Sequence, residues 1–296
     1  MDQQMYQVRV QQLRYRLALL VATGLALLIV APSCAGGQTP IDAAGTARWV
    51  TVGEQRIKTR VHASTDVGEG PTLVLTLHGD LLGPRPPTYH YVFSRRAAAA
   101  IDNVVVAAVL RPGYTDEVGD RSDGERGLRV GDNYTAEVVD VIAEVISDLK
   151  ASFGASRVVV VGHSGGAAIT AALLGRHPAA IDGALLVACP CDVAAWRRHM
   201  HSVRGRDVWL GPVDAVSPIT VAEYVSRSVR VRMIVGSDDQ TTPEELTVEY
   251  AEALQARTVD VAVTIAPGLG HNILLEPIVL AELQQLIASL NVNAGR

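Results

Sequence analysis

Short apolar runs and longer amphipathic stretches alternate along most of the chain. Two segments with period-2 alternation, residues 48–52 and 56–62, flank Gly53-Glu54 and predict an amino-terminal β-hairpin. Wholly or mostly apolar segments of strand length predict strands at residues 72–77, 104–110, 158–161, 183–188, 229–235 and 259–265. Apolar spacing and small helix-forming residues predict helices at residues 93–100, 133–153, 165–176, 243–256 and about 273–290.

This order of elements indicates the fold class. Strands that are apolar on both faces, separated by helical segments, are typical of a mostly parallel sheet with helices covering both sides. We therefore expect one α/β domain over residues 35–296. Residues 191–228 interrupt the alternation with tryptophans and prolines, among them Trp196, Trp209 and Pro218, and predict an inserted lid.

Composition supports a single large core and excludes some functions. Of the 296 residues, 48% are hydrophobic and 19% are charged, which excludes disorder as the overall state. The 26 basic and 31 acidic residues give a net charge of −5, and no run of lysine or arginine forms a basic patch. We therefore expect no nucleic-acid partner.

The first 34 residues have the pattern of an export signal. Arg9, Arg14 and Arg16 precede an uncharged apolar run over residues 17–31, and small residues follow Cys34. Residues 31–34 resemble a bacterial lipobox, in which the cysteine receives lipid. Three outcomes stay open: lipid attachment at Cys34, cleavage without lipid, and an uncleaved membrane anchor. Each places the domain outside the cytoplasm, in the periplasm or cell envelope.

The strongest chemical motif is Gly162-His163-Ser164-Gly165-Gly166. It follows a predicted strand and opens a predicted helix, as a nucleophile elbow requires, and it predicts Ser164 as a nucleophile. The alternative is a glycine-rich helix start with Ser164 as its cap. A serine nucleophile needs a base, so the motif predicts an acid and then a histidine farther along the chain.

Both partners follow later strands. Asp238 and Asp239 come after the strand at 229–235, and His271 comes after the strand at 259–265. Together with His78-Gly79 and the elbow, these motifs resemble the α/β-hydrolase serine hydrolases, with the prolyl-oligopeptidase-like and esterase branches nearest. The resemblance covers about residues 70 to 290 and implies a catalytic triad of Ser164, His271 and Asp239. Asp238 is the competing acid.

The same resemblance implies an oxyanion hole. Its donors map to the backbone N–H groups of Asp80, after His78-Gly79, and of Gly165, after the nucleophile. Leu81 is the alternative to Asp80, and the side chain of His78 is expected to serve structure. Residues 111–114 resemble the family's glycine turn, with Tyr114 as a wall of the site or as part of a tight turn.

Other candidate chemistry is weaker. His199 and His201 point in different directions on a helix, so they do not predict a metal pair. Cys189 and Cys191 fit either a disulfide or two buried thiols. We therefore expect a serine hydrolase of the carboxylesterase type, without cofactor or metal, that acts on a small ester. The alternatives are a serine peptidase for small peptides and a non-catalytic binding lipoprotein of the same fold.

Overall fold

The computed structural model describes residues 45–81, 83 and 85–292. The predicted export signal (residues 1–34), Cys34 included, lies outside these residues. No helix in the described part is both long and apolar enough to cross a membrane.

The described residues form an eight-stranded sheet with the order β1-β2-β4-β3-β5-β6-β7-β8. The first two strands make the predicted hairpin, and β2 pairs with β4 in antiparallel fashion. All other neighbours are parallel. The strands are β1 (Thr46–Val52), β2 (Gln55–Ala63), β3 (Thr72–Leu77), β4 (Val104–Val109), β5 (Arg157–His163), β6 (Gly183–Val187), β7 (Arg230–Gly236) and β8 (Asp260–Ala266).

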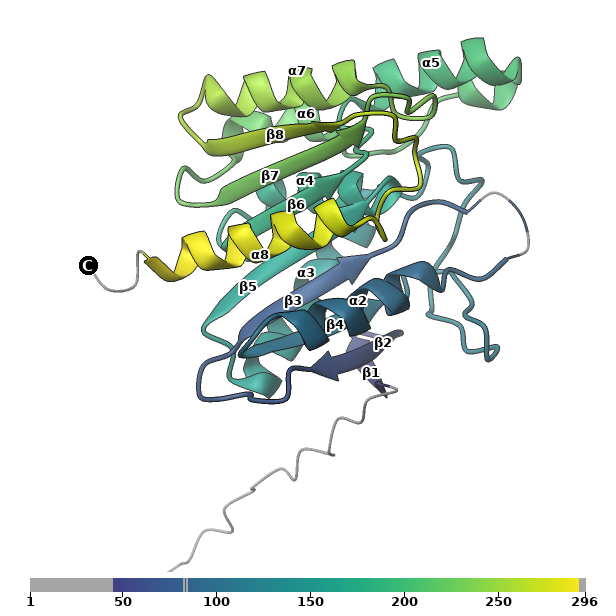
Figure 1. The fold of residues 1–296 in the computed structure, drawn as a ribbon. Helices are drawn as coiled ribbons and strands as arrows, with labels where there is room; N and C mark the ends of the chain where they lie inside the picture. The colour runs from purple at the N-terminus through teal and green to yellow at the C-terminus, as the bar shows by residue number, and fades with distance from the viewer. Residues whose placement is uncertain (1–44, 82, 84, 293–296) are drawn as a thin grey trace, which may run out of the picture. The chain divides into compact units, whose positions relative to one another are not determined.

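Helices cover both faces of the sheet. Figure 1 shows α2 (Tyr89–Ala100) and α8 (Pro277–Val292) on one side, with α3 (Ala136–Phe153) and α4 (Gly165–Arg176) behind the strands. A further helix, α7 (Glu244–Gln255), packs on the same core as α3 and α4. This mixed, mostly parallel sheet between two helical layers is the predicted α/β-hydrolase fold.

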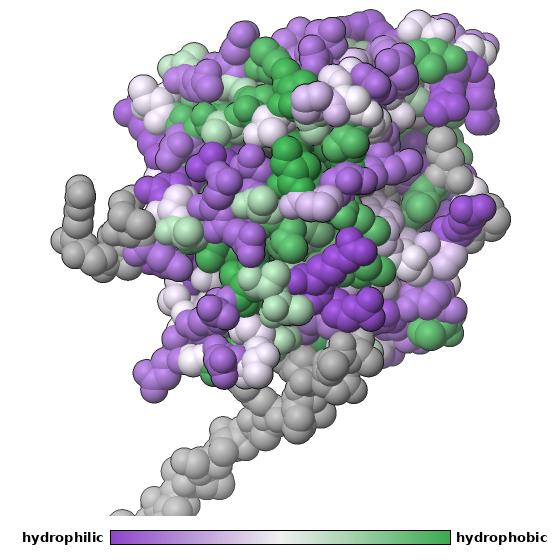
Figure 2. Space-filling model, in the orientation of Figure 1, coloured by the Kyte–Doolittle hydropathy of each residue, from purple (hydrophilic) through white to green (hydrophobic). Residues whose placement is uncertain are grey.

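The all-apolar strands serve two cores at once. Along β5, Val158 and Val160 pack in the cluster shared with α3 and α4, whereas Val159 and Val161 pack in the cluster shared with α2 and α8. Successive side chains of a strand point to opposite faces, so a strand buried on both sides needs apolar residues at every position. On the α2 and α8 side, Figure 2 shows apolar side chains that remain at the surface between polar ones.

Three helices begin at places that the apolar pattern does not mark. The predicted starts at residues 93, 133 and 273 become Tyr89, Ala136 and Pro277. In α3, the Thr135 hydroxyl accepts a hydrogen bond from the backbone N–H of Val138 and caps the first turn. In α8, Pro277 takes the first helical position, where a missing N–H is harmless. Residues 273–276 instead form turns that follow His271.

The interruption at residues 191–228 contains two α-helices and two 3₁₀ turns. They are α5 (Val193–Arg204), the 3₁₀ turn η1 (Asp207–Trp209), α6 (Pro218–Val221) and η2 (Ala222–Tyr224). A disulfide between Cys189 and Cys191 lies where this segment leaves β6, so of the two readings left open by the sequence the structure has the disulfide.

Candidate active site

Ser164 stands on a sharp turn between β5 and α4. Its φ of 54° and ψ of −121° are unusual for a residue with a side chain. The backbone N–H of Ser164 donates to the carbonyl of Val187 at 2.8 Å, which ties the turn to β6. A Cβ at Gly162 would stand 2.4 Å from the carbonyl oxygen of Gly166, so the turn has no room for a larger residue there. The sequence around Ser164 therefore has the geometry of a nucleophile elbow.

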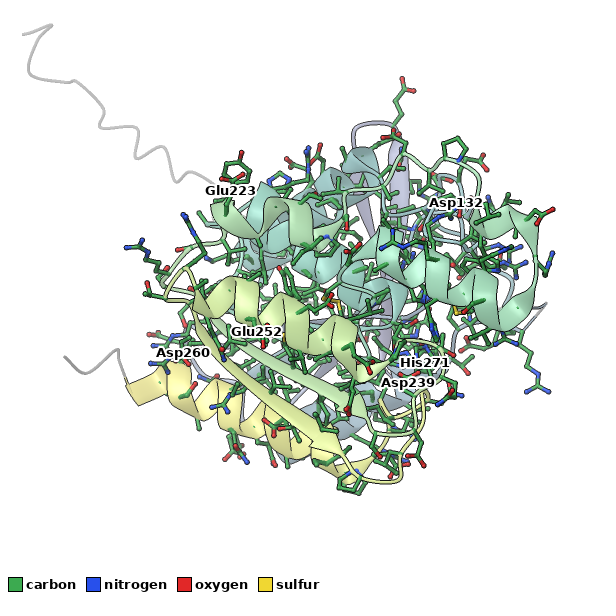
Figure 3. The ribbon with its side chains drawn as sticks, turned by 90° about the horizontal axis from the view of Figure 1, so that it is seen from above. Asp132, Glu223, Asp239, Glu252, Asp260 and His271 are labelled. Carbon is green, nitrogen blue, oxygen red and sulfur yellow. A yellow bond between two sulfur atoms is a disulfide. The ribbon has the colours of Figure 1, made fainter. Side chains whose placement is uncertain are left out.

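The structure brings Ser164, His271 and Asp239 together in one hydrogen-bonded chain. The Nε2 atom of His271 is 3.0 Å from Ser164 Oγ, and its Nδ1 atom is 2.9 Å from Asp239 Oδ2. Figure 3 shows His271 and Asp239 side by side, at the ends of β8 and β7. The side chain of His271 is 18% exposed and that of Asp239 is fully buried. The histidine is therefore open to solvent, whereas the acid is shielded from it.

Asp239 is held as an anion. Its Oδ1 atom accepts from the backbone N–H groups of Thr241 and Thr242, at 2.8 and 2.9 Å, and Oδ2 accepts from the Thr242 hydroxyl at 2.7 Å. Burial raises the pKa of the Asp239 carboxyl, but the bonds from His271 and Thr242 outweigh burial and hold this pKa below its ordinary value. Asp238, the competing acid, is exposed and accepts from the Ser237 hydroxyl.

The expected oxyanion donors lie beside the nucleophile. A Cβ at Gly79 would stand 2.7 Å from Ser164 Cβ, so the turn after β3 touches the elbow. His78 fixes the Gly79–Asp80 peptide, because its Nδ1–H donates to the Gly79 carbonyl at 2.8 Å. Among the described residues, no hydrogen bond engages the backbone N–H of Asp80 or of Gly165. Both are therefore available to a ligand oxygen.

A buried ion pair supports this turn. The Asp80 carboxylate accepts from Arg111 at 2.9 Å and from the hydroxyls of Tyr114 and Tyr134 at 2.9 and 2.7 Å. A Cβ at Gly165 would stand 2.9 Å from Asp80 Oδ1, so the carboxylate borders the oxyanion donors. Burial lowers the pKa of Arg111, but Asp80 and the tyrosines more than compensate and keep this pKa above its ordinary value. The pair therefore places no net charge at the site.

This pair was not predicted from the sequence. Residues 111–114 do make a tight turn, with Gly113 at φ 79°, but Tyr114 points its hydroxyl at Asp80. A usable signal was present: Asp80 and Arg111 each follow one of two strands that pair in parallel, β3 and β4. Residues in that position meet at the same edge of a sheet.

Trp196 on α5, in the inserted segment, contacts the loop that carries Asp239. Its indole N–H donates to the carbonyl of Thr241 at 3.0 Å, and its ring stacks on Tyr134. His199, on the same helix, contacts the carbonyl of Gln240, whereas His201 contacts that of Arg206. Across the described residues, no group of three or more His, Cys, Asp or Glu side chains is arranged to hold a metal ion.

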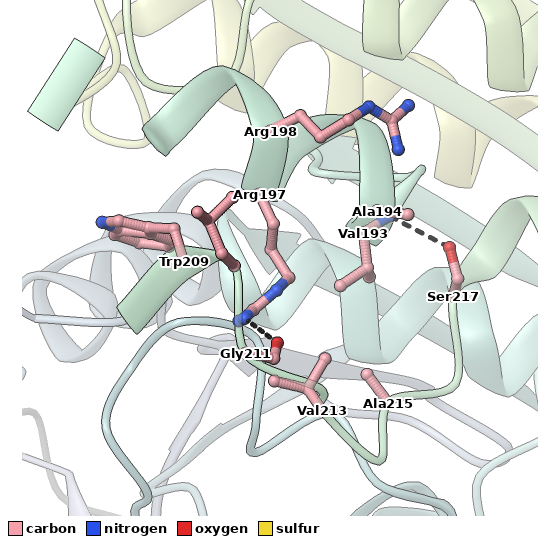
Figure 4. A pocket seen from close by; sticks show the side chains of 10 residues that line it. Val193, Ala194, Arg197, Arg198, Trp209, Gly211, Val213, Ala215 and Ser217 are labelled. Atoms are coloured by element: carbon pink, nitrogen blue, oxygen red, sulfur yellow. Dashed lines mark hydrogen bonds between the residues drawn. The ribbon is translucent and has the colours of Figure 1, made fainter. Parts of the chain in front are cut away.

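Two cavities lie near these elements. The larger, about 340 Å³, lies between α5 and residues 209–217, and none of the triad residues lines it (Figure 4). The smaller, about 200 Å³, is bordered by His163 and Asn272, the chain neighbours of Ser164 and His271, and by Tyr89, Leu274 and Leu275. No triad residue lines the smaller cavity either, and it approaches the site only through these two chain neighbours.

Comparison with known protein families agrees with the fold and the geometry of the triad. The model of the prolyl oligopeptidase family matches residues 93–288. No curated protein matches the chain significantly in sequence.

Solved structures of similar fold carry different activities in their names. The proline iminopeptidase of Mycobacterium smegmatis aligns with a TM-score of 0.62 and 17% identity, over 84% of this chain and 100% of that one. An esterase of Pyrococcus furiosus aligns with a TM-score of 0.59 and 16% identity, over 86% and 96%. The acylaminoacyl peptidase of Pyrococcus horikoshii aligns with a TM-score of 0.61 and 13% identity, over 82% of this chain and 40% of that one. At such low identities the likeness establishes the fold alone.

Proposed function

We propose, for a chain that belongs to the prolyl oligopeptidase family and is a serine hydrolase of the α/β-hydrolase fold, that the substrates are carboxylic esters. Cleavage proceeds through an acyl-enzyme on Ser164. The observation that carries the proposal is the hydrogen-bonded chain from Ser164 through His271 to Asp239, set on a strained turn. The proposed mechanism calls for no cofactor.

In the proposed mechanism each residue of the triad has its own step. His271 Nε2 accepts the Ser164 hydroxyl proton as Oγ attacks the ester carbonyl, and it then gives that proton to the leaving alcohol. Asp239 accepts the Nδ1–H of His271, which keeps Nε2 free as a base and stabilises the imidazolium. Water then attacks the acyl-enzyme carbonyl while His271 accepts its proton. The proton passes to Ser164 Oγ as the carboxylic acid leaves.

The backbone N–H groups of Asp80 and Gly165 stabilise the tetrahedral intermediate. Donors aimed at the position of the developing oxyanion are among the larger contributions to catalysis. The Asp80 carboxylate beside them would oppose a negative charge on the substrate, but Arg111 neutralises it at 2.9 Å. Arg111 therefore prevents the Asp80 carboxylate from repelling the negative charge that develops in the oxyanion hole.

Two features favour an ester over a peptide. Asp80 already accepts hydrogen bonds from one guanidinium and two hydroxyls, so it has little capacity left for the ammonium group of a peptide. The cavity bordered by His163 and Asn272 is small, and its lining includes Leu274 and Leu275 but no carboxylate. Such a cavity suits a small uncharged group of the substrate. Peptide hydrolysis is the second candidate, because the family and two of the neighbours are named for it.

The substrate class is tested with non-activated substrates on the full chain. We expect saturable hydrolysis of ethyl esters of short acids, and no detectable hydrolysis of alanyl or prolyl arylamides at the same concentrations. Ser164→Ala, purified in parallel, controls for contaminating hydrolases. Efficient cleavage of an arylamide, with the ethyl esters untouched, would assign the chain to the peptidases instead.

Two further proposals concern the surroundings of the site. We propose that residues 191–228 form a lid that sets substrate size, which is supported by the contact of Trp196 with the loop that carries Asp239. We also propose export to the periplasm or cell envelope, with a lipid tether at Cys34. The charged, apolar and small-residue order of residues 9–37 supports export.

A further inference from the structure

The residue before the nucleophile, His163, uses both nitrogens of its ring. Nε2 lies 2.9 Å from the backbone carbonyl of His271, and Nδ1 lies 2.9 Å from the hydroxyl of Tyr89. The residue is 4% exposed and packs edge-on against the ring of Tyr89. One buried side chain thus joins the elbow to two separate parts of the site.

Only one assignment of donors and acceptors fits these hydrogen bonds. The carbonyl of His271 can only accept, so Nε2 of His163 carries the hydrogen. Burial, followed by the charge of His271, lowers the pKa of His163 to about 3, and the ring is therefore neutral in neutral solution. Nδ1 is then an acceptor, and the Tyr89 hydroxyl donates to it. The same hydroxyl accepts from the backbone N–H of Gly79 at 2.5 Å.

This series of hydrogen bonds ends at the two parts of the site that must be aligned with Ser164. At one end, the His271 peptide carries the base. At the other, Gly79 immediately precedes Asp80, whose N–H is an oxyanion donor. The backbone N–H of Ile273 also donates to the His271 carbonyl, at 3.0 Å, so that oxygen keeps a partner when His163 is replaced. Replacement therefore affects alignment more than it leaves a polar group unsatisfied.

We propose that His163 is a positioning residue, which sets the His271 loop directly and the oxyanion turn through Tyr89 relative to Ser164. The inference rests on the proposed serine-hydrolase function. An error of about 1 Å in the alignment of reacting groups costs about 100-fold in rate. Loss of His163 should thus lower the rate of attack by Ser164 far more than it weakens substrate binding.

The experiment separates the two hydrogen bonds by substitution. His163→Gln places an amide N–H near the position of Nε2 and keeps the bond to His271. His163→Asn reaches only the position of Nδ1 and keeps the bond to Tyr89. His163→Leu keeps neither, and Tyr89→Phe removes the hydroxyl alone. His177→Gln at the far end of α4, where His177 bonds Asp140, serves as the matched histidine control.

The readouts are the second-order rate of phosphonylation by a fluorophosphonate, kcat and KM for one ethyl ester, and melting curves of the full chain. We expect His163→Leu and His163→Asn to lose about 10- to 100-fold in phosphonylation rate and in kcat, with KM within about threefold. His163→Gln should recover most of the loss. Tyr89→Phe should show an intermediate loss, and the His177 variant should match wild type.

Specific results overturn the inference. A folded His163→Leu protein that reacts at the wild-type rate removes the positioning role, and so does an equal loss in His163→Gln and His163→Asn. If His163→Leu does not fold, the comparison of Gln with Asn decides alone. Failure of wild type to react with the fluorophosphonate would contradict the proposed function itself, and the two failures are therefore distinguishable.

Discussion

Replacement of Asp239 by asparagine changes one carboxylate oxygen, which only accepts hydrogen bonds, into an NH₂ group, which only donates them. In the native structure, Oδ1 of Asp239 accepts from two backbone N–H groups, those of Thr241 and Thr242. The asparagine oxygen must take that place, since an NH₂ group there would face two donors. The NH₂ group then occupies the Oδ2 position, 2.9 Å from Nδ1 of His271.

That arrangement selects the wrong tautomer of His271. The new NH₂ group donates to Nδ1, so the imidazole hydrogen moves to Nε2, the atom that should accept the proton of Ser164. In Ser-His-Asp sites this fault costs about four orders of magnitude in turnover. At about 1.4 kcal/mol per tenfold, the loss corresponds to about 5–6 kcal/mol of transition-state stabilisation. We expect a loss on this scale in a folded Asp239→Asn protein.

The assay is kcat/KM for an ester, with circular dichroism and melting curves to confirm folding. Asp238→Asn is the matched control, because Asp238 is exposed and its side chain, among the described residues, bonds only the neighbouring Ser237. We expect it to lose less than about threefold, as other exposed substitutions do. The reasoning fails if Asp238→Asn is the more damaging of two folded proteins, or if Asp239→Asn stays within tenfold of wild type.

Four other predictions concern stability, the lid and the amino terminus. The pKa of Asp239 is lower in the folded protein than its unfolded value of about 3.9, so its charge stabilises the fold above that pH. The stability difference between wild type and Asp239→Asn should accordingly shrink as the pH falls through and below about 4, and a difference in melting temperature that grows instead would contradict this. Arg111→Met leaves Asp80 buried and unpaired and should cost about 3–5 kcal/mol in denaturant unfolding, against less than about 1 kcal/mol for Arg176→Met in an exposed pair; equal costs would refute the comparison. Shortening residues 191–228 should change the ranking of ester chain lengths more than activity on the smallest ester, and a uniform loss would indicate a purely structural role. In a bacterial host, labelled palmitate should enter wild type but not Cys34→Ser, and unchanged incorporation would exclude lipid at Cys34.

The sequence is most informative where chemistry and local structure share one short segment. At residues 158–166, an all-apolar strand runs directly into a glycine-flanked serine and then into a helix of small residues. Tight packing of the turn requires those glycines: a Cβ at Gly166 would stand 2.4 Å from the carbonyl of Leu77. The strand, the turn and α4 could therefore be predicted together.

Contacts between distant segments are harder to predict. Asp80, Arg111 and Tyr134 lie on three different loops, and no periodic pattern records which carboxylate meets which guanidinium. His163 occupies the variable position of the motif, so nothing local indicates that its ring bridges Tyr89 and the His271 loop. The start of α8 also escaped the pattern, because Ile273 and Leu274 pack in the core from a turn as well as they would from a helix.

The central claim is that Ser164 forms the covalent intermediate, and mass spectrometry after fluorophosphonate labelling tests it most directly. We predict one adduct per chain, mapped to the peptide that contains Ser164, with hydrolysis of esters lost in proportion to labelling. Ser164→Ala should melt at the same temperature and carry no adduct. Equal labelling of the alanine variant, an adduct on another residue, or a fully labelled protein that still hydrolyses esters would contradict the account.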